Sequence, residues 1–119
     1  MYLKLNHQKL DIYGASEQFV LECYRLTKST PAEEKFGMIT QIRRAALSVH
    51  LNIAEGSSRK SEAERKRYYE IAGGLVIEID AALDIAADHA CLHELNIESL
   101  GESMIRCFKI LTGLIESKK

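Results

Sequence analysis

The sequence predicts an all-α protein that folds as an antiparallel up-down-up-down four-helix bundle. Of its 119 residues only one is proline and none is tryptophan, and its common residues Ala, Leu, Ile, Glu and Lys favour helices over strands. Apolar residues recur at spacings of three and four in four segments. Short links separate these segments, as in antiparallel bundles. We expect one bundle domain over residues 10–119, after a weakly ordered or extended segment at residues 1–9.

The first helix is expected from about Leu10 to Lys28. Its apolar face is formed by Ile12, Ala15, Phe19, Cys23 and Leu26. Glu22 and Arg25 are expected on the opposite face, in water. The helix should end before Pro31, because the residue preceding a proline disfavours helical backbone angles.

The second helix has a strong start signal. Thr30 can act as the N-cap, Pro31 suits the first helical position, and Glu33 completes a capping box. The apolar stripe comprises Phe36, Ile39, Ile42 or Arg43, Ala46, Val49 and Ile53. We expect the helix to end near Gly56, in a left-handed C-terminal cap.

The third helix is expected to be long, from the capping pair Ser61 and Glu64 to about His89. Its main stripe is Tyr68, Ile71, Ala72, Leu75, Ile79, Ala82 and Ala86, and a second stripe is Tyr69, Val76 and Leu83. Two apolar faces imply either a central position or a subunit interface. Gly73 and Gly74 cost about 1–2 kcal/mol against alanines, which indicates close helix packing or a kink.

The fourth helix is expected from Asn96 or Ile97 to about Ser117, with a face of Ile97, Leu100, Met104, Phe108, Leu111 and Ile115. The three cysteines are an odd number without the spacing of a disulfide framework, which favours a reducing cytoplasm. We find neither a signal peptide nor an apolar run of the roughly 20 residues that span a membrane. We therefore expect a cytoplasmic protein without a membrane partner.

Charge is segregated along the chain, although its net value is only −1. Residues 43–67 hold seven basic and three acidic side chains, whereas residues 70–102 hold eight acidic side chains and no Lys or Arg. Such a layout can orient partners or pair subunits head to tail.

Five basic residues form the candidate nucleic-acid site: Arg59, Lys60, Arg65, Lys66 and Arg67. They flank a serine-rich turn, where side chains and free N–H groups at a helix start can hold phosphate oxygens. The alternative is a solvated helix face with pairs such as Glu62 with Lys66. Tyr68 and Tyr69 could stack on bases, but apolar packing is the stronger interpretation.

Polar residues on the second helix form a candidate structural or interface set: Arg43, Arg44, Asn52 and Glu55. Arg43 lies beside the apolar stripe, where a guanidinium favours a carboxylate partner. Glu55 is twelve residues away, about 18 Å along a helix, so Glu78 or Glu70 of a neighbouring helix or subunit is preferred. We expect this set to fix helix register and subunit pairing rather than to catalyse a reaction.

Catalytic and metal motifs are weak. His89, Cys91 and His93 alternate, which does not place ligands on one helical face, and structural zinc needs four ligands. Asp80, Asp84 and Asp88 are expected to form a solvated acidic face. The chain shows no nucleophile elbow, phosphate-binding loop or HExxH motif. We expect no enzyme activity, no metal and no cofactor.

The second helix carries a specific signature, Thr40-Gln41-Ile42-Arg43-Arg44-Ala45-Ala46-Leu47-Ser48 followed by Asn52-Ile53-Ala54-Glu55-Gly56-Ser57. Glu33-Glu34-Lys35-Phe36-Gly37 and Tyr69-x-Ile71-Ala72 with Glu78 accompany it. Over about residues 10–116 the chain resembles the 23S rRNA-intervening-sequence proteins. The resemblance implies a four-helix bundle in a ring-like pentamer, with no catalytic activity attached. Some members are encoded within intervening sequences of ribosomal RNA genes.

A related branch of that family serves diversity-generating retroelements and binds nucleic acid and a reverse transcriptase. The chain departs from the family at His50, where proline is frequent, and at Gly73, Leu75 and Ala90, where arginine, serine and glycine are usual. The retroelement branch is markedly basic, unlike this chain, which argues against transferring its nucleic-acid binding. Two functions follow: a pentameric scaffold or adaptor that contacts RNA, DNA or an RNA-associated protein through residues 59–67, or a purely protein-binding module.

Overall fold

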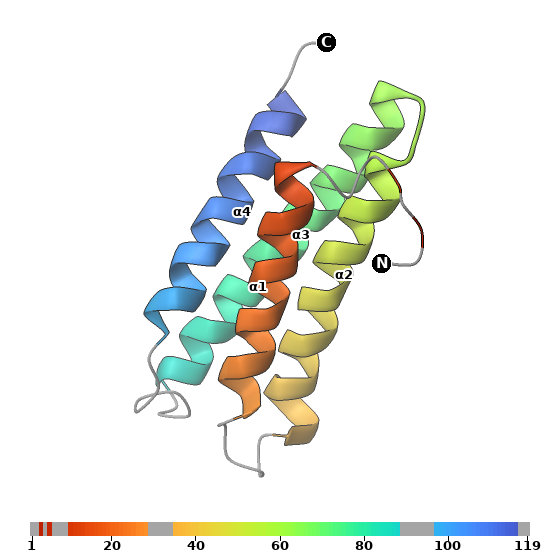
Figure 1. The fold of residues 1–119 in the computed structure, drawn as a ribbon. Coiled ribbons are helices and arrows are strands. Elements are labelled where there is room, and N and C mark those ends of the chain that lie inside the picture. The colour runs from red at the N-terminus through yellow and green to blue at the C-terminus, as the bar shows by residue number, and fades with distance from the viewer. Residues whose placement is uncertain (1–2, 4, 6–9, 29–34, 89–96, 117–119) are drawn as a thin grey trace.

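The computed structural model of the chain is a four-helix bundle (Figure 1), and it describes residues 3, 5, 10–28, 35–88 and 97–116. The helices are α1 (Asp11–Lys28), α2 (Thr40–Ser57), α3 (Glu62–Asp88) and α4 (Glu98–Glu116). A π-helical turn, η3 (Lys35–Ile39), leads directly into α2. The predicted all-α class is confirmed, and no strand occurs in the described ranges.

The helices occupy the corners of a square. α1 and α3 each pack against both α2 and α4, so the α1–α2 side of the bundle lies opposite the α3–α4 side. In Figure 1 the chain descends α1, ascends α2, descends α3 and ascends α4. Cross-helix bonds agree for the first pair, because Ser16 meets His50 near one end of α1 and Thr27 meets Arg43 near the other.

Apolar side chains from all four helices meet in one core. Every residue predicted for the apolar face of the first helix is buried, and the predicted second-helix positions from Ile39 to Ile53 are buried apart from half-buried Arg43. Spacing alone identified the buried faces of these two helices, because each has one clear apolar stripe against polar neighbours, although α2 itself begins only at Thr40.

The stripe predicted for α3 is partly wrong. Its buried hydrophobic side chains, among the described residues, are Tyr69, Ala72, Val76, Ile79, Leu83 and Ala86. Tyr69, Val76 and Leu83 are therefore core residues of the single chain. Of the two predicted explanations for this stripe, a central position in the bundle is correct and a subunit interface is not. Ile71, placed in the main stripe by the sequence, is 44% exposed. The face predicted for α4 is also shifted, since Cys107 is buried while Phe108 is exposed.

Gly56 does not form the predicted left-handed cap. α2 continues through Ser57, and the capping residue Ser58 has right-handed backbone angles. A Cβ added at Gly56 would lie 2.5 Å from the Cβ of Tyr68. The glycine therefore serves the close approach of α2 and α3 rather than a change of backbone direction.

Gly73 and Gly74 do not mark the tight packing predicted from the sequence. A Cβ at Gly73 would meet Ile115 only at the ordinary distance of 4.0 Å, and one at Gly74 would meet nothing within 4 Å. α3 also runs without a break from Glu62 to Asp88. Close packing therefore does not account for this pair, and the alternative of a kink stays a prediction.

Polar contacts correct one prediction and support another. Glu22 is buried rather than in water, and its carboxylate accepts a hydrogen bond from Ser99 Oγ (2.8 Å) and pairs with exposed Arg25 (2.9 Å). At the start of α3 the Glu64 N–H donates to Ser61 Oγ (3.3 Å), as the predicted cap requires.

Several predictions fall outside the described residues. These are the order of most of segment 1–9, the capping box of Thr30, Pro31 and Glu33, and the sequence from His89 to His93. The start of the fourth helix is described from Ile97, and α4 begins at Glu98.

Candidate functional site

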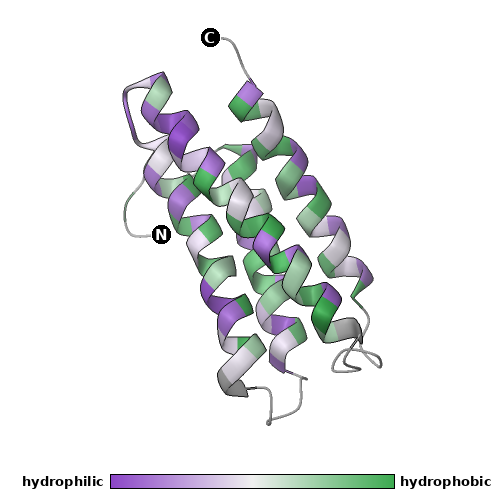
Figure 2. Ribbon diagram, turned by 180° about the vertical axis from the view of Figure 1, so that it is seen from behind, coloured by the Kyte–Doolittle hydropathy of each residue, from purple (hydrophilic) through white to green (hydrophobic). Residues whose placement is uncertain are grey.

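The five basic residues predicted to bind nucleic acid lie together at the turn between α2 and α3, and we call them the basic turn: Arg59, Lys60, Arg65, Lys66 and Arg67. The turn is short because α2 ends at Ser57 and α3 begins at Glu62. Figure 2, which views the bundle from behind, shows hydrophilic colouring at this end of α3.

Arg59 is held within the chain. Its guanidinium pairs with the Glu55 carboxylate, donates to Tyr68 Oη (3.2 Å) and stacks over the Tyr68 ring at 5.2 Å from the centroid. The hydrogen bond to Tyr68, followed by the charge of Glu55, raises the pKa of Arg59 above its ordinary value. Glu55 therefore pairs with Arg59, four residues later in the turn, and not with Arg43.

Arg65 and Lys66 also have partners in the chain. Arg65 Nη1 donates to the carbonyl oxygens of Arg59 (3.0 Å) and Lys60 (2.8 Å), which stabilises the turn. Lys66 Nζ lies 3.3 Å from Glu62 Oε1, which confirms the intrahelical pair predicted as the alternative to phosphate binding. Both side chains therefore stabilise the turn and the start of α3 within the chain itself.

Lys60 and Arg67 are the two exposed basic residues of this set. Within the described part of the chain neither side chain has an ion pair or hydrogen bond. A cavity of about 290 Å³ lies alongside the turn, between the start of α3, the start of α1 and the end of α4, and its lining includes Arg65 and Lys66. The positive charge available to an external anion is concentrated on Lys60 and Arg67.

Tyr69 does not present its ring to solvent. It is 5% exposed, and its hydroxyl lies 2.8 Å from Ser57 Oγ, which links the end of α2 to α3. Tyr68 is half-buried under Arg59. Tyr69 therefore packs in the apolar core, which was the preferred interpretation of the sequence.

Among the described residues of this chain, Arg43 bonds neither of the glutamates predicted for it, and a carboxylate on a neighbouring subunit stays a prediction. Arg43 Nε donates to Thr27 Oγ1 (2.6 Å), and its guanidinium lies 5.0 Å from the Tyr24 ring centroid. Glu78 instead accepts a hydrogen bond from Gln41 (3.5 Å). Arg43 thus fixes the packing of α1 on α2, whereas its expected partner Glu78 connects α2 to α3.

The other polar residues of α2 make local contacts or none. Asn52 is half-buried, and its amide donates to the Ser48 carbonyl oxygen (2.8 Å) of the preceding turn. Arg44 is exposed and has no polar partner among the described residues. Their predicted role in subunit pairing stays a prediction.

Ser16 and His50 form a buried polar contact that the sequence did not predict. Ser16 Oγ donates to the Tyr13 carbonyl oxygen (3.0 Å) and lies 2.7 Å from His50 Nδ1. The Tyr13 and His50 rings are tilted at 53° with centroids 4.6 Å apart. This contact lies between α1 and α2, where Ser16 is fully buried, so it stabilises the packing of two helices.

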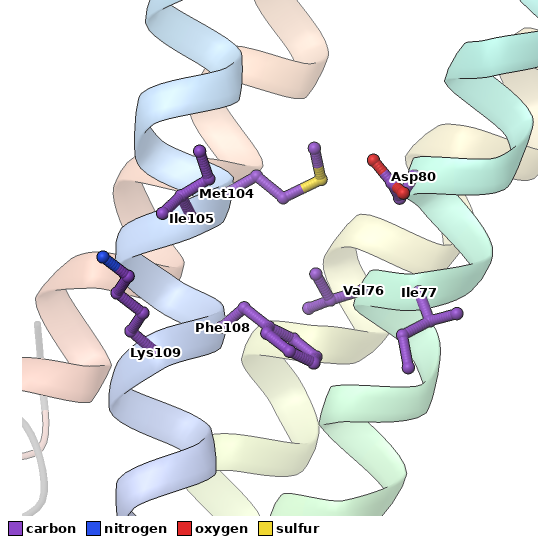
Figure 3. Close-up of a pocket in the computed structure, with 7 residues that line it drawn as sticks. All are labelled: Val76, Ile77, Asp80, Met104, Ile105, Phe108 and Lys109. Atoms are coloured by element: carbon purple, nitrogen blue, oxygen red, sulfur yellow. The ribbon is translucent and has the colours of Figure 1, made fainter.

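An apolar groove runs between α3 and α4, where Figure 3 shows the side chains that line it. Its volume is about 280 Å³, with Ile77 and Asp80 on the α3 side and Met104, Ile105 and Phe108 on the α4 side. Ile77 and Ile105 are 59% and 57% exposed. The sequence predicted excess apolar surface on the third helix, and of the second stripe only Val76 lines this groove, from a position that is 2% exposed.

The structure also bears on two other possibilities, a metal site and a membrane-spanning helix. Within the described ranges no group of three or more His, Cys, Asp or Glu side chains is arranged to hold a metal ion. No helix in the same ranges is both long and apolar enough to cross a membrane.

A family model described as 23S rRNA-intervening sequence protein matches residues 8–113. The chain belongs to this family. The match includes all of α1, α2 and α3 and most of α4, so the α2 signature, the basic turn and the α3–α4 groove all lie within the matched region.

A solved structure with a similar fold comes from Bacteroides thetaiotaomicron and is described as a protein with unknown function from the S23 ribosomal protein family. The two chains are 24% identical, and their superposition has a TM-score of 0.80. The match covers 89% of this chain and 99% of the other, which shows a shared fold. The curated proteins compared with the chain gave no significant match.

Proposed function

We propose that the protein is a non-enzymatic, homo-oligomeric scaffold, a pentamer in its assembled form, that contacts RNA or an RNA-associated protein through the basic turn of each copy. The observation that carries this proposal is the exposure of apolar side chains in the α3–α4 groove, above all Ile77 and Ile105. Contiguous apolar surface on a folded domain is characteristic of interaction sites. The pentamer is the assembly implied by the family resemblance.

The basic turn supports the second half of the proposal. Lys60 and Arg67 are exposed, and Arg65 braces the turn by donating to two of its backbone carbonyl oxygens. A rigid turn loses little entropy when it binds. Five copies would present five such turns, so a weak contact by each can add to a measurable affinity.

The oligomer is tested by native mass spectrometry and light scattering over a range of protein concentrations. A mass of five chains supports the pentamer. A monomer at every concentration would contradict the scaffold.

Nucleic-acid binding is tested by fluorescence anisotropy with structured RNA and with duplex DNA at increasing salt. We expect log K to fall linearly with log salt, and the Lys60→Ala/Arg67→Ala variant to lower the steepness of that dependence. Lys28→Ala is the control, because it removes an exposed basic residue at the end of α1, at the opposite end of the bundle from the turn. Absence of salt-dependent binding at low ionic strength would rule out the nucleic-acid contact.

A second candidate is a protein-binding module without nucleic-acid contact. It is favoured by the internal pairing of Arg59 with Glu55 and of Lys66 with Glu62, which neutralises much of the basic turn. In that case the anisotropy experiment shows no binding to either nucleic acid, while the mass measurement still gives an oligomer.

A further inference from the structure

We infer that the cavity beside the basic turn is a binding site for a nucleoside monophosphate, either free or as the 5′-phosphorylated end of an RNA. Three kinds of group share the wall of this cavity: apolar side chains, a pair of hydroxyl groups and a guanidinium. The inference goes beyond the proposed function, which assigns RNA contact to the exposed residues Lys60 and Arg67 and association to the α3–α4 groove.

The cavity lies at the end of the bundle where α1 and α3 begin and α2 and α4 end (Figure 1). Its volume of about 290 Å³ is near the lower end of the range for small-molecule sites. The lining consists of Leu10, Ser57, Leu114 and four residues of α3, Glu62, Arg65, Lys66 and Tyr69. Spacings of three, four and seven place these four on one face of the first two turns of α3.

The core closes the cavity on its inner side. Ile53, one turn before Ser57 in α2, and Leu111, one turn before Leu114 in α4, are fully buried. A long acyl chain therefore has no channel to follow into the bundle. Leu10 is 45% exposed and Leu114 is half-buried, so both can contact a ligand. The apolar part of that ligand must be short.

Two hydroxyl groups form a polar part of the wall. Tyr69 Oη lies 2.8 Å from Ser57 Oγ, and this contact uses one of their two protons. Neither hydroxyl makes another hydrogen bond within the described residues, so one O–H remains to donate. The Glu62 carboxylate, whose Oε1 faces Lys66, can accept through its second oxygen. A nucleobase carries both donors and acceptors along its edges, which a simple alkyl or aryl acid does not.

Arg65 supplies a cation for the phosphate. Its Nη1 donates to the carbonyl oxygens of Arg59 and Lys60, whereas Nε and Nη2 have no hydrogen-bond partner in the part of the chain that the structure describes. The bonds to the turn hold the guanidinium in place, and its Nε–Nη2 edge can donate two parallel bonds to a phosphate. The lining has two basic side chains and one acidic side chain, which favours an anion.

A nucleoside monophosphate uses all three kinds of group at once. Its base contacts Leu10 and Leu114 and presents a polar edge to the hydroxyl pair, and its phosphate accepts from Arg65. Inorganic phosphate would leave the two leucines uncovered, and an unphosphorylated nucleoside would leave the guanidinium edge without a partner. These two compounds are therefore the informative part-ligands.

Isothermal titration calorimetry with adenosine 5′-monophosphate, adenosine and inorganic phosphate tests the inference. We expect the monophosphate to bind more tightly than either part-ligand by about tenfold or more, because it alone combines the charge-assisted bonds with the apolar contact.

Two variants locate the site, each with a matched control. Arg65→Gln should weaken binding of the monophosphate about tenfold, and Tyr69→Phe about fivefold, since each removes donors while keeping much of the side chain. Arg106→Gln removes an exposed arginine of α4 and Tyr24→Phe an exposed hydroxyl of α1, both outside the cavity lining, and both should bind as the wild type does. Circular dichroism melts verify folding, and Tyr69→Phe decides if Arg65→Gln does not fold.

A short RNA separates the two sources of the ligand. An adenosine trinucleotide with a 5′-phosphate should bind as tightly as the free monophosphate, and its 5′-hydroxyl form much more weakly, if the cavity accepts an RNA end. Loss of binding by both trinucleotides would assign the cavity to the free nucleotide.

Three outcomes would overturn the inference. These are no binding of the monophosphate, equal affinity for the monophosphate and inorganic phosphate, and unchanged affinity in both Arg65→Gln and Tyr69→Phe. The proposed RNA contact fails separately. Salt-dependent binding of structured RNA without binding of the monophosphate would leave that contact standing and remove the nucleotide site, and the reverse result would do the opposite.

Discussion

Gly56 and Tyr68 lie so close together that a methyl group on Gly56 would approach the Tyr68 Cβ to 2.5 Å. Gly56 is buried in the last turn of α2, and Tyr68 is half-buried near the start of α3. The atom in conflict is a Cβ, which cannot move without its backbone. The absence of a side chain at position 56 therefore sets how closely the two helices approach beside the basic turn.

Gly56→Ala is expected to destabilise the protein. Overpacking of a well-packed site costs about 1–3 kcal/mol, and the gain in helix propensity from alanine offsets about 1 kcal/mol at most. We expect the urea midpoint to fall, with a net loss of about 1–2 kcal/mol. A variant as stable as the wild type would show that α2 and α3 can separate without cost.

Gly74→Ala is the same substitution at a glycine with free space around it, and we expect the opposite effect on stability. A Cβ there meets no atom within 4 Å, and position 74 lies well inside α3. Alanine should raise the free energy of unfolding by about 0.5–1 kcal/mol, because glycine loses more backbone entropy on folding. An unchanged free energy of unfolding would contradict the expected entropic gain from alanine at this position.

The accuracy of the sequence prediction differs between helices for a physical reason. α1 has one apolar stripe with polar residues elsewhere, and each predicted core position is buried. α3 has isoleucines on several sides, including Ile71, Ile77 and Ile85, so a period of 3.6 fits more than one face. Which face is buried depends on α2 and α4, whose positions a single helical pattern does not contain.

The candidate site shows the same division between local and distant contacts. The Glu62–Lys66 pair was predictable because four residues separate its members on one helix. Arg43 and Thr27 are sixteen residues apart, and Ser16 and His50 are thirty-four apart, on different helices. No spacing rule connects such residues. Chemistry alone predicted a carboxylate partner for Arg43, and the partner within the chain is the Thr27 hydroxyl.

The hydrogen bond between Tyr69 and Ser57 provides another test. Tyr69 is buried and its hydroxyl lies 2.8 Å from Ser57 Oγ. Tyr69→Phe and Ser57→Ala should each cost about 0.5–1.5 kcal/mol in urea unfolding, and the double variant should cost less than their sum. Strictly additive losses would mean that the two hydroxyl groups do not stabilise each other.

Arg65 and Arg67 should differ although they are two residues apart. Arg65→Ala removes two hydrogen bonds to the carbonyl oxygens of the turn, and we expect it to lower the free energy of unfolding by about 1 kcal/mol. Arg67→Ala changes an exposed side chain and should stay within about 0.5 kcal/mol of the wild type. Chemical denaturation of the two variants side by side provides the measurement, and equal losses would contradict a structural role specific to Arg65.

The two buried thiols predict a loss of stability at alkaline pH. Burial raises the pKa of Cys23 from 9.0 to about 12, with smaller contributions from Glu22 and Cys107, and burial likewise raises the pKa of Cys107 to about 12. In the unfolded chain the thiols lose protons near their ordinary pKa, whereas in the folded chain they keep them. The stabilisation is therefore complete below about pH 9 and is lost as the pH rises towards 12.

Thiol labelling checks the same property in a Cys91→Ser background, where Cys23 and Cys107 are the remaining cysteines. The thiolate is the reactive form, so at pH 8 a disulfide reagent should label neither thiol in the folded protein and both in urea. Urea unfolding at pH 7 and pH 10 should then show a smaller loss of stability in Cys23→Ala than in the parent, since one of the two titrating thiols is absent. Rapid labelling of both thiols under native conditions would show that α1 and α4 separate readily, and would contradict the protection that burial in the core predicts.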